Sequence, residues 1–441
     1  MDLRDFIVAP FVILGVYALA FYLRPRLCDE INYKYFFPAL TVKIIGALAV
    51  GLLYQFHYRG GDTFSYHTHG SRVIWEVLTN DLSTGLSLVF STDQHDVYKY
   101  SSQIIFFNDP SSFFVVQVAA LLDILTFSSY AGTAVLFAFI SFLGLWYLFR
   151  TFYEMFPHLY RRIAVCTLFV PSVVFWGSGI LKDTIVMACL GFGTWLIKKV
   201  FIDRKGSLLE LVLLVVSLVV IFSVKKYVLL CYMPVAIFWV YARNLQRIRQ
   251  VMLRLMLVPI LLITAGVSGY YAVQKVGEDD PKYALDKIAQ TARVTAYDIG
   301  FWSGRNAGSG YSLGELDGSF GNLLAHMPAA INVSLFRPYL WEVKNPLMLL
   351  SALEALVLLV ITAFLFVRSP LSFVRSLGNP DVLFCLVFSV SFAFAVGVST
   401  YNFGTLNRYK IPLIPFYLIA LTIIADRSNN ERKVEVLEAT E

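Results

Sequence analysis

Apolar residues in this chain occur in long unbroken runs rather than in the alternating pattern of β-strands. Each run has about 17 to 20 residues, enough for a helix to cross a hydrocarbon core about 30 Å thick. A membrane β-barrel would alternate over about ten residues, and no other structure satisfies the backbone in lipid. The pattern therefore predicts an all-α, polytopic integral membrane helical bundle.

The runs predict about 11 or 12 transmembrane helices in a single transmembrane domain, residues 1 to 425. The expected spans are roughly 6 to 23, 37 to 56, 112 to 129, 131 to 149, 163 to 177, 184 to 199, 207 to 223, 228 to 242, 254 to 272, 346 to 367, 381 to 399 and 411 to 425. Long polar segments interrupt them at about 58 to 111 and 274 to 340. Residues 426 to 441 are polar and charged, and we expect a disordered tail.

Basic residues gather at alternate ends of the predicted spans, which marks the cytoplasmic side. These clusters are Arg161 and Arg162; Lys198, Lys199, Arg204 and Lys205; Arg243, Arg247, Arg249 and Arg254; Arg368 and Arg375; and Arg427, Arg432 and Lys433. Alternation between them predicts a cytoplasmic C-terminus. It also places residues 177 to 183, 274 to 340 and 401 to 410 on the outer face.

The side of the first polar segment depends on the run from 112 to 129. If that run spans the membrane, the segment is cytoplasmic; if it is re-entrant or interfacial, the segment lies on the outer face. Gln117 and Asp123 within the run favour the second interpretation. That interpretation also puts the basic residues between 24 and 34 on the inner side.

Composition agrees with the membrane assignment. The 441 residues are 58% hydrophobic and only 15% charged, which excludes a soluble domain of this size. The net charge of +6 is what positive-inside loops produce, so it predicts no nucleic-acid partner. The five cysteines are scattered without CxxC spacing and suggest neither disulfides nor a zinc site.

The segment from Tyr58 to His69 is the first candidate for a reaction centre. Gly60 and Gly61 allow backbone conformations closed to other residues, so they can present Asp62 on a tight turn at the membrane surface. An acidic group in that position can act as a general base. Asp62 is therefore the candidate catalytic residue.

The neighbours of Asp62 supply further candidate contacts. We expect Arg59 and Tyr66 to bind substrate. With Asp62, the imidazoles of His67 and His69 form a workable ligand set for a divalent cation such as Mg or Mn. A solvated turn lined with interfacial aromatic residues is the alternative to a metal site.

A second signal lies at residues 177 to 183, where an apolar helix breaks and the next begins with Lys182 and Asp183. Amides at a helix start beside an ammonium suit a phosphate, so Lys182 is a candidate phosphate ligand and Asp183 a candidate substrate contact. In the alternative, Asp183 caps the helix and Lys182 extends to the interface.

A third signal opens the last span. Arg408 and Lys410 are basic residues on the predicted outer face, against the positive-inside tendency, so an anion should compensate them. A phospholipid headgroup or a bound diphosphate would do so, and Arg408 has the forked geometry for it. Arg337 is a further candidate phosphate ligand, with a structural ion pair to Glu342 as the alternative.

The glycine-rich piece from residue 302 to 311 carries Trp302, Arg305 and Tyr311. These side chains suit a mobile lid that contacts a sugar, although a plain loop explains them equally well. The chain contains no Walker A motif, GxSxG, HExxH or dinucleotide fingerprint. The energy for any reaction must therefore come with the substrate.

These features together resemble the GT-C class of membrane glycosyltransferases and the related polysaccharide polymerases. The resemblance rests on an acid in the first large outer segment, basic residues at the outer ends of later helices, and about a dozen spans. It implies a polyprenyl-phosphate-linked sugar as donor, a glycan or lipid acceptor, and a location in the bacterial cytoplasmic membrane for envelope polysaccharide assembly. Asp62 would deprotonate the acceptor hydroxyl, while Lys182, Arg337, Arg408 and Lys410 would hold the leaving phosphate.

One departure from the GT-C pattern concerns the acid. GT-C enzymes usually carry it after the first span and often in an acidic pair, whereas Asp62 follows the second predicted span without an adjacent acid. This departure shifts the expectation toward a metal-free polymerase.

Two other classes of function remain open. A transporter or flippase of a lipid-linked or anionic solute would use Lys43, Asp123 and Glu354, which lie inside apolar runs. Such proteins place their key charges near the bilayer midplane, and the candidates above favour the rim. A non-catalytic subunit of a membrane complex is the third possibility, and the sequence identifies no protein partner.

Overall fold

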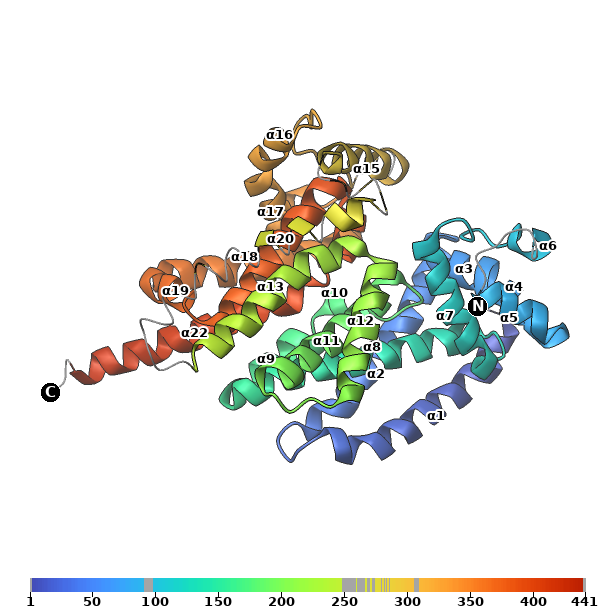
Figure 1. The fold of residues 1–441 in the computed structure, drawn as a ribbon, viewed down its shortest axis with the longest axis horizontal. Coiled ribbons are helices and arrows are strands. Elements are labelled where there is room, and N and C mark those ends of the chain that lie inside the picture. Colours follow the sequence, from blue (N-terminus) through green and yellow to red (C-terminus); the bar gives the residue numbers. More distant parts are fainter. Residues whose placement is uncertain are drawn as a thin grey trace. The chain divides into compact units, whose positions relative to one another are not determined.

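The structure is a computed structural model that describes residues 2 to 90, 98 to 247 and 309 to 438 (Figure 1). Between 247 and 309 it also describes residues 259, 266, 267, 270, 271, 274 to 278, 280, 282, 284 and 286 to 304. For residues 300, 302 to 304 and 432 to 438 only the backbone is described. The chain divides into two compact units, residues 1 to 196 with 208 to 226, and residues 197 to 207 with 227 to 441.

Every named element among the described residues is a helix, which confirms the all-α fold. Seven described helices are long and apolar enough to cross a membrane, or eight if the bent pair α21 (Phe403–Tyr409) and α22 is one span. Three shorter apolar helices accompany them. The protein is therefore an integral membrane protein with several spans.

Most predicted spans correspond to a helix of the structure. Two of them, 112 to 129 and 207 to 223, correspond to 17-residue helices. The predicted span 163 to 177 was wrong, because two short helices replace it. Pro171 opens the second helix and holds Val170 extended, since proline disfavours a helical residue before it. The predicted span 254 to 272 lies mostly outside the described residues.

The first unit is built around α8. Its elements are α1 (Leu3–Leu27), α2 (Tyr33–Leu52), η1 (Leu53–His57), α3 (Asp62–Tyr66), η2 (His67–Ser71), α4 (Arg72–Asn80), α5 (Leu82–Phe90), α6 (Tyr98–Ser101), α7 (Pro110–Thr126), α8 (Tyr130–Met155), η3 (Pro157–Leu159), α9 (Tyr160–Leu168), α10 (Pro171–Trp176), α11 (Lys182–Ile197) and α12 (Leu208–Val224). Helix α8 packs against α1, α2 and α9. Gly144 and Gly191 bring α8 and α11 into backbone contact, since a Cβ on Gly191 would lie 2.0 Å from the Gly144 carbonyl oxygen.

The first unit has a basic end and an opposite, polar end. At the basic end, the Lys34 ammonium lies 5.2 Å from the centre of the Tyr160 ring, next to Arg161. At the other end, α2 leads into α3, and Thr63 is hydrogen-bonded to Tyr130 at the start of α8. The polar segment from 58 to 111 is mainly helical in its described part and begins at this second end.

The second unit is built around α20. Its elements are η4 (Lys198–Ile202), α13 (Lys226–Leu245), α15 (Ile288–Gly304), α16 (Phe320–Ala325), α17 (Met327–Phe336), η6 (Leu340–Glu342), α18 (Pro346–Arg368), α19 (Pro370–Ser376), α20 (Pro380–Thr400), α21 (Phe403–Tyr409) and α22 (Leu413–Glu438). Helix α20 packs against α15, α17, α21 and α22. In Figure 1, α18, α20 and α22 are among the orange and red helices of this unit.

Basic residues of the second unit gather where α20 begins. Arg243 forms a bidentate ion pair with Asp381 in the first turn of α20. Arg427 donates to the Arg375 carbonyl oxygen at 3.0 Å. The predicted outer residues 401 to 410 follow the opposite end of α20, as the alternation of charge requires.

The predicted disordered tail is instead helical as far as Glu438. Ser372 on α19 donates to Glu431, and Ser428 donates to Ser369 at 2.7 Å. These side-chain bonds hold the polar turns of α22 against α19. The sequence prediction failed because composition alone does not reveal such contacts.

Candidate active site

Asp62 begins α3 directly after a tight turn, as the sequence predicted. Arg59, Gly60 and Gly61 have φ angles of 54°, 136° and 111°, all in the left-handed region. A Cβ on Gly61 would also lie 3.0 Å from the ring of Tyr54. The two glycines therefore fix where α3 starts, which leaves Asp62 half-buried and Arg59 exposed.

The short helix α3 is held against the start of α8. The hydroxyl groups of Thr63 and Tyr130 lie 2.7 Å apart, and the Phe64 ring stacks on Tyr130 with centroids 4.6 Å apart. Tyr66 is buried with its ring 4.9 Å from that of Phe106. The predicted substrate contact Tyr66 is thus a packing residue.

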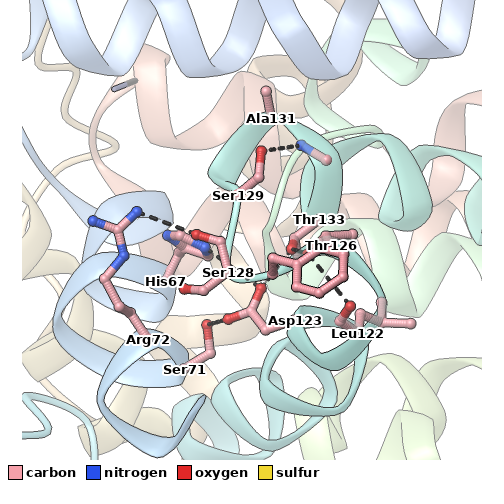
Figure 2. Close-up of polar contacts among 12 residues, drawn as sticks. His67, Ser71, Arg72, Leu122, Asp123, Thr126, Ser128, Ser129, Ala131 and Thr133 are labelled. Atoms are coloured by element: carbon pink, nitrogen blue, oxygen red, sulfur yellow. Dashed lines mark hydrogen bonds and ion pairs between the residues drawn. The ribbon is translucent and has the colours of Figure 1, made fainter. Parts of the chain in front are cut away.

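His67 and His69 lie in different environments, although both belong to the π-helical turn η2. His67 is fully buried, with its ring 5.5 Å from that of Tyr130 and its Nε2 3.5 Å from Asp123 Oδ1 (Figure 2). His69 is exposed. The described residues contain no group of three or more His, Cys, Asp or Glu side chains placed to hold a metal ion. The predicted cation site at Asp62 is therefore not assembled here, and we derive no step through a metal.

Asp123 is the centre of a buried polar cluster that joins η2, α7 and α8 (Figure 2). Its carboxylate accepts hydrogen bonds from Ser71 at 2.7 Å and Thr133 at 2.5 Å. Thr126 and Thr133 hydroxyls lie 2.6 Å apart. Asp123, an acid inside an apolar run, is therefore hydrogen-bonded within the protein.

A second set of polar contacts fastens the turn between α7 and α8. Asp5 accepts hydrogen bonds from the Ser129 hydroxyl at 2.8 Å and the Ala131 amide at 2.9 Å. Arg72 donates to the Ser128 carbonyl oxygen at 3.2 Å. Since Arg72 follows η2 directly, these bonds further restrain the segment that carries Asp62.

Lys182 lies beside the start of α7. Its ammonium donates to Ser111 Oγ at 2.7 Å and lies 3.4 Å from Asp109 Oδ2. Partial burial raises the pKa of the Asp109 carboxyl, but hydrogen bonds from Ser112 and Ser111 and the charge of Lys182 outweigh it and lower the pKa overall. The structure thus joins the two segments predicted to carry the acid and the phosphate ligand.

The two ends of α7 lie near elements that are connected to the Asp62 segment. Helix α7 begins beside Lys182 and ends beside the start of α8, where Asp123 meets His67. Gly179, just before Lys182, packs on Val50 near the end of α2, which leads into the same segment. Both ends of α7 therefore contact elements at the polar end of the first unit, and the side of the membrane on which the Asp62 segment lies stays a prediction.

Asp183 is bound within the protein. Its buried carboxylate lies 2.5 Å from the ammonium of Lys225, which is also buried. A carboxylate in a buried ion pair is costly to separate from its partner. Asp183, predicted as a substrate contact, is therefore a structural residue of α11 in this arrangement.

Lys43 is also engaged inside the first unit. Its ammonium donates to the carbonyl oxygens of Val173 at 3.2 Å and Gly177 at 2.5 Å, which end α10. The Ser141 hydroxyl binds the same Gly177 oxygen at 2.7 Å. Lys43 thus satisfies carbonyl groups of the broken helix, so its burial has a structural explanation.

In the second unit, two predicted outer segments lie together. Tyr311 N donates to the Tyr401 carbonyl oxygen at 3.1 Å, and Phe403 N to that of Ser309 at 2.8 Å. The Tyr311 hydroxyl lies 2.7 Å from that of Thr400. Tyr311 is therefore a buried anchor rather than a mobile sugar contact. Of its predicted companions, Arg305 and the side chain of Trp302 lie outside the described residues.

Arg337 forms the structural ion pair that was the alternative to phosphate binding. Its guanidinium makes a forked contact with Glu342 and lies 5.3 Å from the centre of the Phe403 ring. Burial raises the pKa of Glu342, but hydrogen bonds from Arg337 and the Tyr339 amide outweigh it and lower the pKa. The guanidinium of Arg337 is thus already paired with Glu342. Arg337 itself lies beside the start of α21.

Arg408 and Lys410 lie at a break between helices, and both are buried, with 8% and 1% of their surface exposed. Helices α21 and α22 meet there at an angle of 67°. The Glu354 carboxylate on α18 is close enough for its charge to act on Lys410. Buried cations at a helix break are a feature that the sequence indicated only through their charge.

The predicted site residues thus form two groups. Asp62 and Lys182 belong to the polar end of the first unit, and Arg337, Arg408 and Lys410 belong to the second. The sequence missed Ser71, Ser111 and Thr133, because single hydroxyl residues carry no recognisable pattern. Comparison with protein-family models, curated proteins and solved structures finds no match to this chain.

Proposed function

We propose that this integral membrane protein is a glycosyltransferase or glycan polymerase. Its donor would be a polyprenyl-phosphate-linked sugar, and its acceptor a hydroxyl group of a glycan or lipid at the outer face of a bacterial cytoplasmic membrane. The C-terminus would then be cytoplasmic. One observation carries the proposal: a half-buried carboxylate and an ammonium begin two helices at the same end of the first unit.

In the proposed reaction, the acceptor oxygen attacks the anomeric carbon of the donor sugar. The bond between that carbon and the phosphate oxygen breaks, and its electron pair leaves with the lipid phosphate. Asp62 takes the proton of the acceptor hydroxyl as general base. In the first unit, Lys182 would stabilise the negative charge on the leaving phosphate. In the second unit, Arg408 and Lys410 are candidate ligands for a lipid phosphate.

The internal contacts assign lesser roles to other candidates. Asp183 and Arg337 are bound by Lys225 and Glu342, so we assign them to positioning rather than to phosphate binding. Arg59 is exposed beside Asp62 and remains a candidate substrate contact.

The test of function is Asp62→Asn in cells that carry the variant as their only copy. We expect loss of the envelope glycan with unchanged amounts of folded protein in the membrane. Glu76→Gln, an exposed acid of the same segment, is the matched control and should leave the glycan unchanged. Full glycan synthesis by Asp62→Asn would disprove the assignment.

A second test concerns topology. In a chain without its native cysteines, we would introduce single cysteines at His69, Asn108 and His158 and label intact cells with a membrane-impermeant maleimide. The first two positions lie at the polar end and should label, while the third lies beside the basic end and should be protected. Protection at His69 would place Asp62 on the cytoplasmic side and end the proposed site.

A further inference from the structure

The break between α21 and α22 contains two buried polar side chains, and one of them has an oxygen without a hydrogen-bond partner within the described part of the chain. The amide oxygen of Asn407 is buried without a partner, on a side chain that is 9% exposed. Lys410 is 1% exposed, and the nearby charge of Glu354 acts on its ammonium. Buried polar groups are almost always bonded, so each group needs an explanation.

The two groups lie on one face of the helix. Lys410 ends α21 with helical backbone angles, φ −78° and ψ −10°. Residues three apart on a helix are neighbours on its surface, so Asn407 and Lys410 are adjacent. One group is an acceptor and the other a charged donor, yet no hydrogen bond joins them. A molecule that satisfies both must present an anionic acceptor and a donor side by side.

The backbone at the break also suits an anion. Helix α22 begins at Leu413, only three residues after Lys410, and the two helices are bent by 67°. The first turn of a helix has amide groups without partners in the helix and carries a partial positive charge. Broken membrane helices use this feature to bind ligands at the break.

We propose that the break between α21 and α22 binds the headgroup of a phosphate ester that also carries a hydroxyl group. Lys410 binds the phosphate, and the Asn407 amide oxygen accepts the hydroxyl. The site deepens the phosphate-binding part of the proposed function and rests on it for the identity of the natural ligand. A lipid-linked sugar phosphate has both groups, and so does a soluble polyol phosphate.

The test is a calorimetric titration of the purified full-length protein in neutral detergent with two short-chain lipids. Dihexanoylphosphatidylglycerol carries a phosphate diester and hydroxyl groups, and dihexanoylphosphatidylmethanol carries the same charge without a hydroxyl. We expect the hydroxyl to strengthen binding by about 3- to 10-fold, the range of one neutral hydrogen bond. Equal affinities would overturn the role of Asn407.

Two variants measure the contributions of Lys410 and Asn407 to binding separately. Lys410→Met should weaken both lipids by about tenfold or more, because it removes a charged donor. Asn407→Leu should bind phosphatidylglycerol only as tightly as wild type binds phosphatidylmethanol. Lys344→Met removes an exposed lysine of the same unit and should change neither affinity. Unchanged binding by Lys410→Met, or no binding of either lipid by the wild type, would overturn the site.

Further titrations identify the source of the ligand and separate this site from the reaction. If glycerol 1-phosphate binds as tightly as phosphatidylglycerol, the headgroup chemistry is supported and the ligand is soluble; much weaker binding indicates a lipid. If the lipids bind as expected but Asp62→Asn still makes glycan, the site stands and glycosyl transfer does not. If Lys410→Met binds the lipids normally and Asp62→Asn makes no glycan, glycosyl transfer stands and the proposed binding site does not.

Discussion

Asp123 in the first unit and Lys410 in the second are both buried ionisable residues of apolar helices, but they are satisfied very differently. Asp123 accepts two hydroxyl hydrogen bonds and faces an imidazole 3.5 Å away. The Lys410 ammonium has the charge of Glu354 nearby, but no bonded cluster of hydroxyl groups like that around Asp123 is described for it. The first residue is bound by its own chain, and the second is left to bind something else.

This difference distinguishes buried charges that stabilise the fold from buried charges that are candidates for binding a ligand. A charge taken out of water is costly unless partners replace the water, so a satisfied buried charge contributes to holding helices together. In the first unit, such contacts fix the segment that carries Asp62. In the second unit, only the charge of Glu354 offsets part of this cost at the helix break. Substitutions at the two places should therefore change stability in opposite directions.

The largest effect is expected at the buried ion pair of the first unit. Lys225→Met leaves the Asp183 carboxylate buried without its cation and should lower the free energy of unfolding by about 3 to 5 kcal/mol. Denaturant titration in detergent micelles measures this change. Lys226→Met, at the neighbouring lysine, should have a much smaller effect.

The double variant Lys225→Met with Asp183→Leu tests the cause. Replacing both charges by apolar groups removes the buried carboxylate together with its cation, so most of the lost stability should return. If the double variant is as unstable as Lys225→Met alone, the loss comes from packing and not from the ion pair.

The next largest effect is expected for Asp123→Ala. Ser71 and Thr133 would lose their acceptor, and a cavity would remain among three elements, which together should cost about 3 kcal/mol of unfolding free energy. His67→Phe is the matched control, because neither imidazole nitrogen has a hydrogen-bond partner among the described residues. It should cost less than about 1 kcal/mol. Equal losses in the two variants would show that Asp123 is not the centre of the cluster.

The sequence predicted the helical membrane fold because runs of apolar residues depend only on local composition. It also predicted the Asp62 turn, since Gly60 and Gly61 signal a left-handed backbone directly. The break at Pro171 was missed, although proline and its extended neighbour are local signals as well. A continuous apolar run outweighed a single residue in that interpretation.

The contents of the candidate site were less predictable, because they depend on contacts between distant residues. Asp109 and Lys182 are separated by 73 positions, and Asp183 and Lys225 by 42. Charge alone made Asp183 and Arg337 resemble ligand-binding residues. Only the folded structure shows that Asp183 is paired with Lys225 and that Arg337 is paired with Glu342.

Lys410→Met should not lower stability, unlike the substitutions of buried charged residues in the first unit. It removes a buried ammonium whose cost the charge of Glu354 offsets only in part, so stability should stay unchanged or rise by about 1 kcal/mol. Thermal unfolding of the purified protein without added lipid measures this effect. A loss comparable to that of Lys225→Met would mean that Lys410 is a structural partner, and the contrast between the two units would fail.

The smallest effect on stability is expected for Asp109→Asn, where a half-exposed acid pairs with Lys182. Such pairs contribute about 0.2 to 1 kcal/mol. Because the pKa of Asp109 is lowered in the folded protein, its contribution is present above its usual pKa and is lost as the pH falls through the lower folded value. The stability difference between wild type and Asp109→Asn should therefore begin to shrink below about pH 4 and vanish below the folded pKa of Asp109. Unlike stability, phosphate binding should respond clearly at neutral pH. Removing the carboxylate removes an anion that competes with phosphate for the Lys182 ammonium, so a titration with polyprenyl monophosphate should show tighter binding by Asp109→Asn. Unchanged or weaker binding would mean that Lys182, like Lys225, belongs to the structure and not to the site.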